Sequence, residues 1–195
     1  MRMSPKESKK HLRNKRYEDQ KRFERWAAFS FLEMFNKLTG SDFVPHLSEV
    51  PDLIAISSTD KKRKLGIEVT ELHNINKLKK IFLKTDEGTW GTQALFETLK
   101  HVFDKKSQTD YREGFAVVLL LVNRFYVCQP HDINKFFLRR YRIPKHHFDS
   151  IFLLTPRITR KMVDHSTYQL FKLKNNQFMK QAEVKRETTH QRPRR

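Results

Sequence analysis

The sequence predicts an α/β protein in which a mixed central sheet is flanked by helices, in the order α-β-β-β-α-β with extra C-terminal elements. Apolar residues recur at three- and four-residue steps over residues 20–38, which is typical of a helix with one buried face. Apolar runs at 53–56 and 65–72 flank a polar turn and indicate a β-hairpin. A second helical pattern at 92–106 precedes a uniformly apolar run at 115–122, which predicts a central strand.

The chain has 195 residues, a length that favours one domain with terminal extensions. Residues 1–19 are basic and poor in apolar side chains, and we expect them to form an arm that is disordered on its own. Residues 20–173 are expected to form the single α/β domain. Residues 174–195 are polar and basic, and a disordered tail is expected there.

Local signals place the ends of the remaining elements. Gly40 suits the left-handed position that often ends a helix, so the first helix should stop there. A short edge strand is expected around residues 42–44, broken by Pro45. Residues 72–90 are interpreted as a long, lysine-rich loop. The expected elements beyond residue 123 are a helix at 133–141 and strands at 150–156 and 167–173.

Charge indicates the class of partner. The chain carries 40 Lys and Arg against 22 Asp and Glu, a formal net charge of +18, which makes a polyanion the expected partner. The alternative is a basic surface kept for solubility, or association with a ribosome. The longest apolar run is too short to cross a bilayer, and the single Cys128 excludes an intramolecular disulfide. We therefore expect a cytoplasmic nucleic-acid-binding protein without a membrane partner.

The hairpin carries two acidic residues into an otherwise apolar sheet. If its turn centres near Asp60, Asp52 and Glu68 are near-opposite neighbours, with β-carbons roughly 5 Å apart. Two bare carboxylates so close repel each other unless a cation lies between them. Side chains alternate along a strand, so Thr70 shares a face with Glu68. The pattern predicts a cluster of Asp52, Glu68 and Thr70, with the Val69 carbonyl as a further oxygen ligand.

The segments Pro51-Asp52 and Glu68-Val69-Thr70 resemble the signature of the PD-(D/E)XK nuclease superfamily. This resemblance implies a restriction-endonuclease-like core and hydrolysis of phosphodiester bonds, in DNA rather than RNA. It implies that Asp52 and Glu68 hold the metal, and hard oxygen ligands favour Mg²⁺ or Mn²⁺. Many members of the superfamily work as homodimers, so that assembly is open here.

The chain departs from the family signature at Thr70, where the family has a lysine. A threonine hydroxyl can position a water molecule but supplies no positive charge. Two lysines are candidates for the missing catalytic role. Lys100 lies on the second helix, and Lys64 lies on the same strand and face as Glu68.

The resemblance also implies an acidic residue on the first helix that completes the metal site. Glu33, at the edge of the apolar stripe, is the residue we assign to this role. Its alternative role is that of a surface glutamate paired with Lys37. Glu24 is the weaker candidate and is expected to face solvent.

Basic residues in the hairpin turn, the long loop and the helix at 133–141 are expected to contact phosphates: Lys61, Lys62, Arg63, Lys79, Lys80, Arg139 and Arg140. Three functions are compatible with these residues. The first is a Mg²⁺-dependent deoxyribonuclease. The second is a catalytically inactive protein of the same fold that binds nucleic acid. The third is an unrelated basic RNA-binding α/β protein, in which Asp52 and Glu68 cap turns or pair with lysines.

Overall fold

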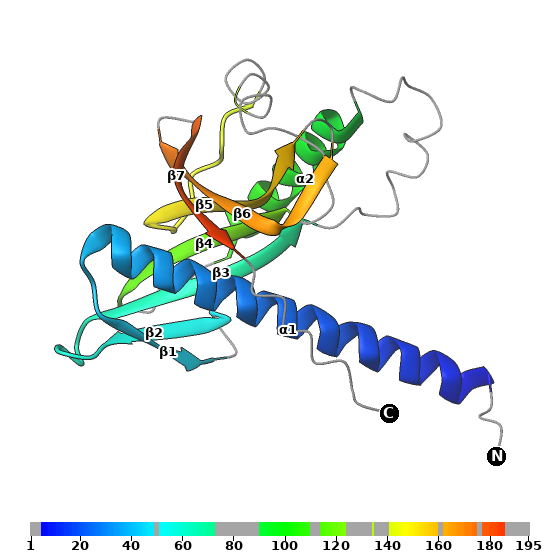
Figure 1. The fold of residues 1–195 in the computed structure, drawn as a ribbon, viewed down its shortest axis with the longest axis horizontal. Helices are drawn as coiled ribbons and strands as arrows, with labels where there is room; N and C mark the ends of the chain where they lie inside the picture. Colours follow the sequence, from blue (N-terminus) through cyan, green and yellow to red (C-terminus); the bar gives the residue numbers. More distant parts are fainter. Residues whose placement is uncertain are drawn as a thin grey trace.

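A computed structural model describes residues 5–48, 51–72, 90–109, 114–123, 134, 141–159, 162–174 and 177–185. The expected α/β class is confirmed. Seven strands form one mixed sheet, and the two long helices of the described part pack against it (Figure 1). From the N-terminal end, the elements follow the order helix, three strands, helix, strand, and three further strands complete the sheet.

The strands lie in the sheet in the order of the chain, from β1 to β7. β1, β2 and β3 are antiparallel neighbours, β3 to β5 run parallel, and β5 to β7 are antiparallel again. Helix α2 lies between β3 and β4 in the chain and makes the crossover that parallel neighbours require. The bounds are β1 Phe43–Leu47, β2 Leu53–Ser57, β3 Lys64–Leu72, α2 Trp90–Lys106, β4 Ala116–Asn123, β5 Ser150–Thr159, β6 Met162–Lys174 and β7 Gln177–Lys185.

The central strand β4 is buried on both faces. Val117, Leu119 and Leu121 pack in the core that α2 covers, whereas the residues between them pack in the core that helix α1 (Pro5–Thr39) covers. A strand covered on both sides has no polar face, which is why its sequence is uniformly apolar. The two helices therefore lie on opposite faces of the sheet.

Helix α1 spans Pro5–Thr39, and its 35 residues make it roughly 52 Å long. The expected start at residue 20 is wrong, because most of the predicted basic arm is helical. Its N-terminal part extends beyond the sheet (Figure 1), so no apolar stripe marks it in the sequence. Lysine, arginine and glutamate are good helix formers, and proline suits a first turn. The helix ends as predicted, with Gly40 at a φ of 65°.

Two further expectations need correction. β1 runs through Pro45, which an edge strand tolerates because one side of it needs no ladder donor. The tail expected to be disordered from residue 174 instead forms β7, which pairs with β6 up to Lys185. The expected loop at 72–90 and helix at 133–141 lie almost wholly outside the described residues, as do Lys79, Lys80, Arg139 and Arg140.

Candidate functional site

Asp52 lies immediately before β2 and is held by the backbone of β3. The predicted register is confirmed, because Leu53 pairs with Ile67 and the hairpin is symmetric about residue 60. Asp52 itself lies outside the ladder, and its Oδ2 accepts a hydrogen bond from the Val69 N–H at 3.0 Å. The carboxylate is thus fixed at the end of the hairpin opposite its turn.

A glycine in β3 allows the chain to approach this point closely. A Cβ atom added at Gly66 would lie 2.8 Å from Cγ of the buried Pro51, closer than two carbon atoms can approach. The proline ring is rigid, so a side chain at this position would push the segment away. Gly66 therefore sets the position of Pro51 and, through it, of Asp52.

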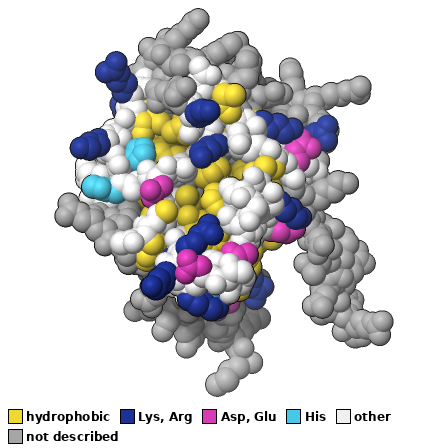
Figure 2. All heavy atoms as spheres, turned by 90° about the vertical axis from the view of Figure 1, so that its left-hand side faces the viewer, with side chains coloured by type: hydrophobic (Ala, Val, Ile, Leu, Met, Phe, Trp, Pro, Cys, Tyr) yellow, Lys and Arg dark blue, Asp and Glu magenta, His cyan; other side chains and the backbone are white. Residues whose placement is uncertain are grey.

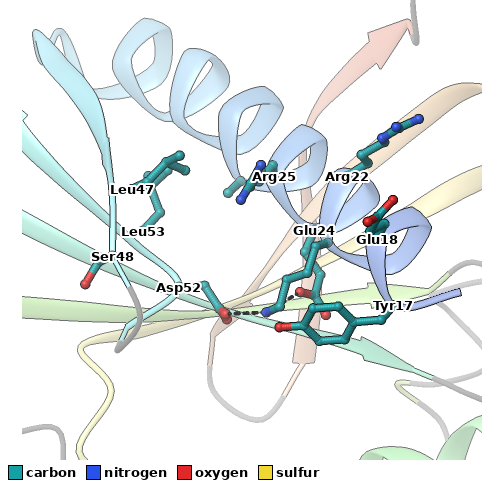
Figure 3. A pocket seen from close by; sticks show the side chains of 11 residues that line it. Tyr17, Glu18, Arg22, Glu24, Arg25, Leu47, Ser48, Asp52 and Leu53 are labelled. Carbon is teal, nitrogen blue, oxygen red and sulfur yellow. Dashed lines mark hydrogen bonds and ion pairs between the residues drawn. The ribbon is translucent and has the colours of Figure 1, made fainter. Parts of the chain in front are cut away.

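Asp52 shares a cation with a glutamate of α1. The Lys21 ammonium lies 2.8 Å from Glu24 Oε2 and 3.3 Å from Asp52 Oδ1 (Figure 3). The other oxygen of Glu24 accepts a hydrogen bond from Gln20 Nε2 at 2.9 Å. The hydrogen bond to Glu24 raises the pKa of Lys21 above its ordinary value, burial opposes this, and the charges of Glu24 and Asp52 add to the rise. The ammonium stays charged between two carboxylates.

The position of Glu24 contradicts the sequence-based prediction. Glu24 was expected to face solvent, yet it is only 8% exposed. Ala28, one turn later on the same face, is also buried, so the buried face of α1 is wider than the aromatic stripe alone suggests. The small side chains of Ala27 and Ala28 were the sequence signal that the helix approaches the sheet closely here.

The position of Glu33 also differs from the prediction. Its side chain is 63% exposed and its Oε1 lies 2.6 Å from Lys37 Nζ. This is the paired surface glutamate that the sequence left as the alternative, and the metal-ligand role of Glu33 stays a prediction that this geometry does not support. Glu33 lies on the side of α1 that faces away from the sheet, so the acid of α1 that approaches Asp52 is Glu24.

Glu68 binds a lysine from the other helix. Lys106, at the end of α2, donates a hydrogen bond to Glu68 Oε1, and both side chains are largely buried. Asp52 and Glu68 therefore contact two different lysines, one from each helix, on opposite faces of the sheet. The expected arrangement, in which both carboxylates share one cation, is not the arrangement in the structure.

The remaining predicted catalytic residues are separate from these ion pairs. Lys64 is exposed at the start of β3, opposite Ile56, and Lys100 is exposed on α2. In the described part of the chain, the lysines that reach the carboxylates are Lys21 and Lys106 instead. The buried Oγ1 of Thr70 lines a cavity of about 200 Å³ beside Lys106 and has no hydrogen-bond partner among the described residues.

A cavity of about 610 Å³ opens beside Asp52, between α1 and the ends of β1 and β2 (Figure 3). Most of the α1 residues that line it carry charged groups, and the exceptions are the aromatic Tyr17 and the small Ala28. Leu47 of β1 and Leu53 of β2 contribute apolar side chains, and Ser48 and Asp52 line it from the segments next to these strands. The side chains that matter for its chemistry are Tyr17, Lys21, Arg22, Glu24, Arg25, Leu47, Asp52 and Leu53.

The predicted phosphate contacts of the hairpin turn lie away from this cavity. Lys61, Lys62 and Arg63 are exposed at the far end of β2, roughly 17 Å of strand from Asp52. The Arg63 guanidinium lies over the Phe43 ring at 5.5 Å. On the face drawn in Figure 2, Lys and Arg side chains are spread around apolar atoms and interleaved with a few acidic groups. Positive charge is thus distributed over this face rather than gathered in one stripe.

The fold and these contacts define an α/β protein with a charged cavity at one end of a hairpin. No protein-family model, no curated protein and no solved structure matches the chain significantly. Within the described residues, no three His, Cys, Asp or Glu side chains are close enough together to hold a metal ion. Neither helix of the described part is both long and apolar enough to span a membrane.

Proposed function

We propose that the protein is a nucleic-acid phosphodiesterase, a Mg²⁺-dependent nuclease whose centre is the cavity at Glu24 and Asp52. The observation that carries the proposal is the convergence of these two carboxylates on one cation, the Lys21 ammonium. A site that holds one positive charge between two carboxylates is electrostatically suited to hold a different cation in its place. Mg²⁺ needs only one or two carboxylates from the protein, because water and substrate phosphates fill its other positions.

The donor set therefore fits a magnesium ion, although it contains fewer than three acidic groups. When bound, the ion supplies Lewis-acid stabilisation of the phosphate and activates water for attack. The protein's own groups orient the site. The Val69 N–H fixes one oxygen of Asp52, and Gln20 fixes one oxygen of Glu24, which leaves the other two oxygens directed at the cation.

Charge and topology give further support. A net charge of +18 favours binding to phosphates, and phosphate contacts provide affinity without sequence preference. The order helix, three strands, helix, strand is the order that the resemblance to the PD-(D/E)XK superfamily implies. Glu68 lies on β3 and Pro51-Asp52 immediately precede β2, and in this proposal the acid of the first helix is Glu24 rather than Glu33.

A specific observation favours a second function, nucleic-acid binding without cleavage. Lys21 already neutralises the carboxylates of the proposed centre, Lys106 neutralises Glu68 on the other face of the sheet, and Thr70 replaces the lysine of the family signature. In such a protein, Asp52, Glu24 and Glu68 serve to attach the helices to the sheet. The two functions differ in metal binding and in turnover, so one set of variants separates them.

The test uses the full chain with supercoiled plasmid and with single-stranded DNA, in Mg²⁺, Mn²⁺ or EDTA. We expect cleavage that requires the metal and is lost in Asp52→Asn and in Glu24→Gln. Glu33→Gln is the matched control, because it removes an exposed carboxylate from the same helix and should cleave like the wild type. Titration calorimetry with Mn²⁺ should show binding that the first two variants lose. Binding of DNA without any metal-dependent cleavage would refute the nuclease and leave the second function.

A further inference from the structure

The cavity beside Asp52 has an apolar side as well as a charged one. Tyr17 and Leu47 are among the large hydrophobic side chains that remain exposed, at 62% and 61% respectively. Both line this cavity, one from α1 and the other from the end of β1, and the buried Leu53 at the start of β2 lines it as well. Exposed side chains of this size at the rim of one cavity provide a surface on which a flat, partly apolar group can pack.

The charged side of the cavity is divided between cations and anions. Arg22 and Arg25 are exposed on the same helix as Tyr17 and line the same cavity. Glu24 and Asp52 lie deeper, joined through Lys21 (Figure 3). Along α1, the cavity thus offers the Tyr17 ring and then interleaved acidic and basic groups from Glu18 to Arg25, and Asp52 adds a carboxylate from just before β2.

We propose that this cavity binds one unpaired nucleotide, so that the preferred ligand is single-stranded nucleic acid or an unpaired end. The base packs on Tyr17, and the adjoining phosphate pairs with Arg22 or Arg25. This inference rests on the proposed function for its partner, nucleic acid, and adds which form of it enters the site. A volume of about 610 Å³ lies within the range of pockets that enclose small molecules.

The stacking of bases in a duplex explains why this cavity should prefer single strands to double strands. A base in a duplex is stacked on both faces, so it can reach the Tyr17 ring only after unstacking, which costs a few kcal/mol. An unpaired base has a free face, and stacking on an aromatic side chain then adds affinity whatever the base. Arginine beside the ring suits this ligand because its planar group binds phosphate through two parallel hydrogen bonds.

The test measures binding in EDTA, so that neither a metal nor cleavage enters the result. Fluorescence anisotropy compares a labelled 12-nucleotide oligo-dT with a blunt duplex of equal length, for the wild type, Tyr17→Ala and Tyr17→Phe. We expect Tyr17→Ala to weaken oligo-dT binding about tenfold or more, the loss typical of one stacked base, and Tyr17→Phe to bind like the wild type. Duplex binding should be the same in all three proteins.

Phe29→Ala is the matched control, since Phe29 is an aromatic residue of α1 that is 43% exposed and does not line the cavity. It should leave both affinities unchanged. Arg22→Ala should lower the salt dependence of oligo-dT binding, because it removes one phosphate contact. The inference is overturned if Tyr17→Ala binds oligo-dT normally, or weakens both ligands equally, or if the wild type binds no nucleic acid at all.

Failure of this inference is distinguishable from failure of the nuclease proposal. If the wild type cleaves nothing in Mg²⁺ but prefers single strands, and Tyr17→Ala lacks this preference, the nuclease is refuted and the nucleotide site is supported. A wild type that cleaves DNA, and whose oligo-dT affinity does not depend on Tyr17, supports the nuclease and overturns the nucleotide site.

Discussion

The ion pair between Glu68 and Lys106 provides the sharpest test of how α2 is attached to the sheet. The side chains are 11% and 20% exposed, so both charges are largely removed from water. Replacing Lys106 with methionine keeps the aliphatic chain but leaves the Glu68 carboxylate buried without this partner. Breaking a buried pair in this way costs about 3–5 kcal/mol, and the partial exposure of Lys106 favours the lower end. We expect Lys106→Met to reduce the free energy of unfolding by about 3 kcal/mol.

Urea unfolding followed by circular dichroism measures this loss as a shift of the midpoint at constant m-value. Lys105→Met is the matched control, because Lys105 is exposed on the same turn and its loss should change stability by less than about 0.5 kcal/mol. The double variant Glu68→Gln, Lys106→Met removes both charges and should recover much of the loss, which isolates the coupling between them. Equal stability of Lys106→Met and Lys105→Met would show that the pair contributes nothing and refute the reasoning.

Three further changes test the site and the hairpin turn. Lys21→Met leaves two carboxylates facing each other, so Mg²⁺ should raise its melting temperature more than that of the wild type; an equal rise contradicts the proposed metal site. Gly66→Ala places a Cβ 2.8 Å from Pro51 and should cost about 1–3 kcal/mol, measurable by urea unfolding. Hydrogen bonds from Ser58, Ser57 and Thr59 lower the pKa of Asp42, so its stabilisation is present above the ordinary aspartate range and is lost as pH falls through the lowered value. Acid titration of Asp42→Asn should therefore show a weaker decline of stability below about pH 4 than the wild type.

The hairpin register was predictable, because it depends on local signals. The polar turn and the apolar runs on either side of it fix which residues oppose each other, and Leu53 pairs with Ile67 as the symmetry about Asp60 requires. The direction of the Asp52 side chain was not predictable in the same way. Asp52 lies just outside the ladder, where alternation no longer applies, and it binds the Val69 N–H instead of pointing beside Glu68.

The partners of the acidic residues are long-range contacts, and the sequence holds too many candidates for them. Lys21 reaches Asp52 across 31 residues of chain, and Lys106 reaches Glu68 across 38. Among 40 Lys and Arg, nothing local distinguishes these two. Glu24 was more accessible to prediction, since Ala28 one turn later marks a close approach to the sheet.

Helix α1 shows why its apolar pattern predicted only part of its length. Its second half packs on the sheet and carries an apolar stripe, so the sequence places it correctly. Its first half extends beyond the sheet (Figure 1), and its sequence carries no such stripe. Helix propensity alone, from residues such as lysine, arginine and glutamate, continues the helix to Pro5. The periodicity of apolar residues therefore indicates where a helix packs on another element, and it cannot predict a helix that has no packing partner.

The two ion pairs differ in a way that bears on which carboxylates could exchange their cation. Lys106 is 20% exposed and sits against Glu68 on the α2 face, whereas Lys21 is 37% exposed and lies at an open cavity. Displacing a lysine is less costly where its ammonium can return to water, because a freed charge must be solvated again. We therefore expect any metal to enter on the α1 side, at Glu24 and Asp52, while Glu68 keeps Lys106 and holds α2 to the sheet. Glu68→Gln would then lower the free energy of unfolding and leave the metal affinity largely unchanged. Asp52→Asn would mainly lower the metal affinity.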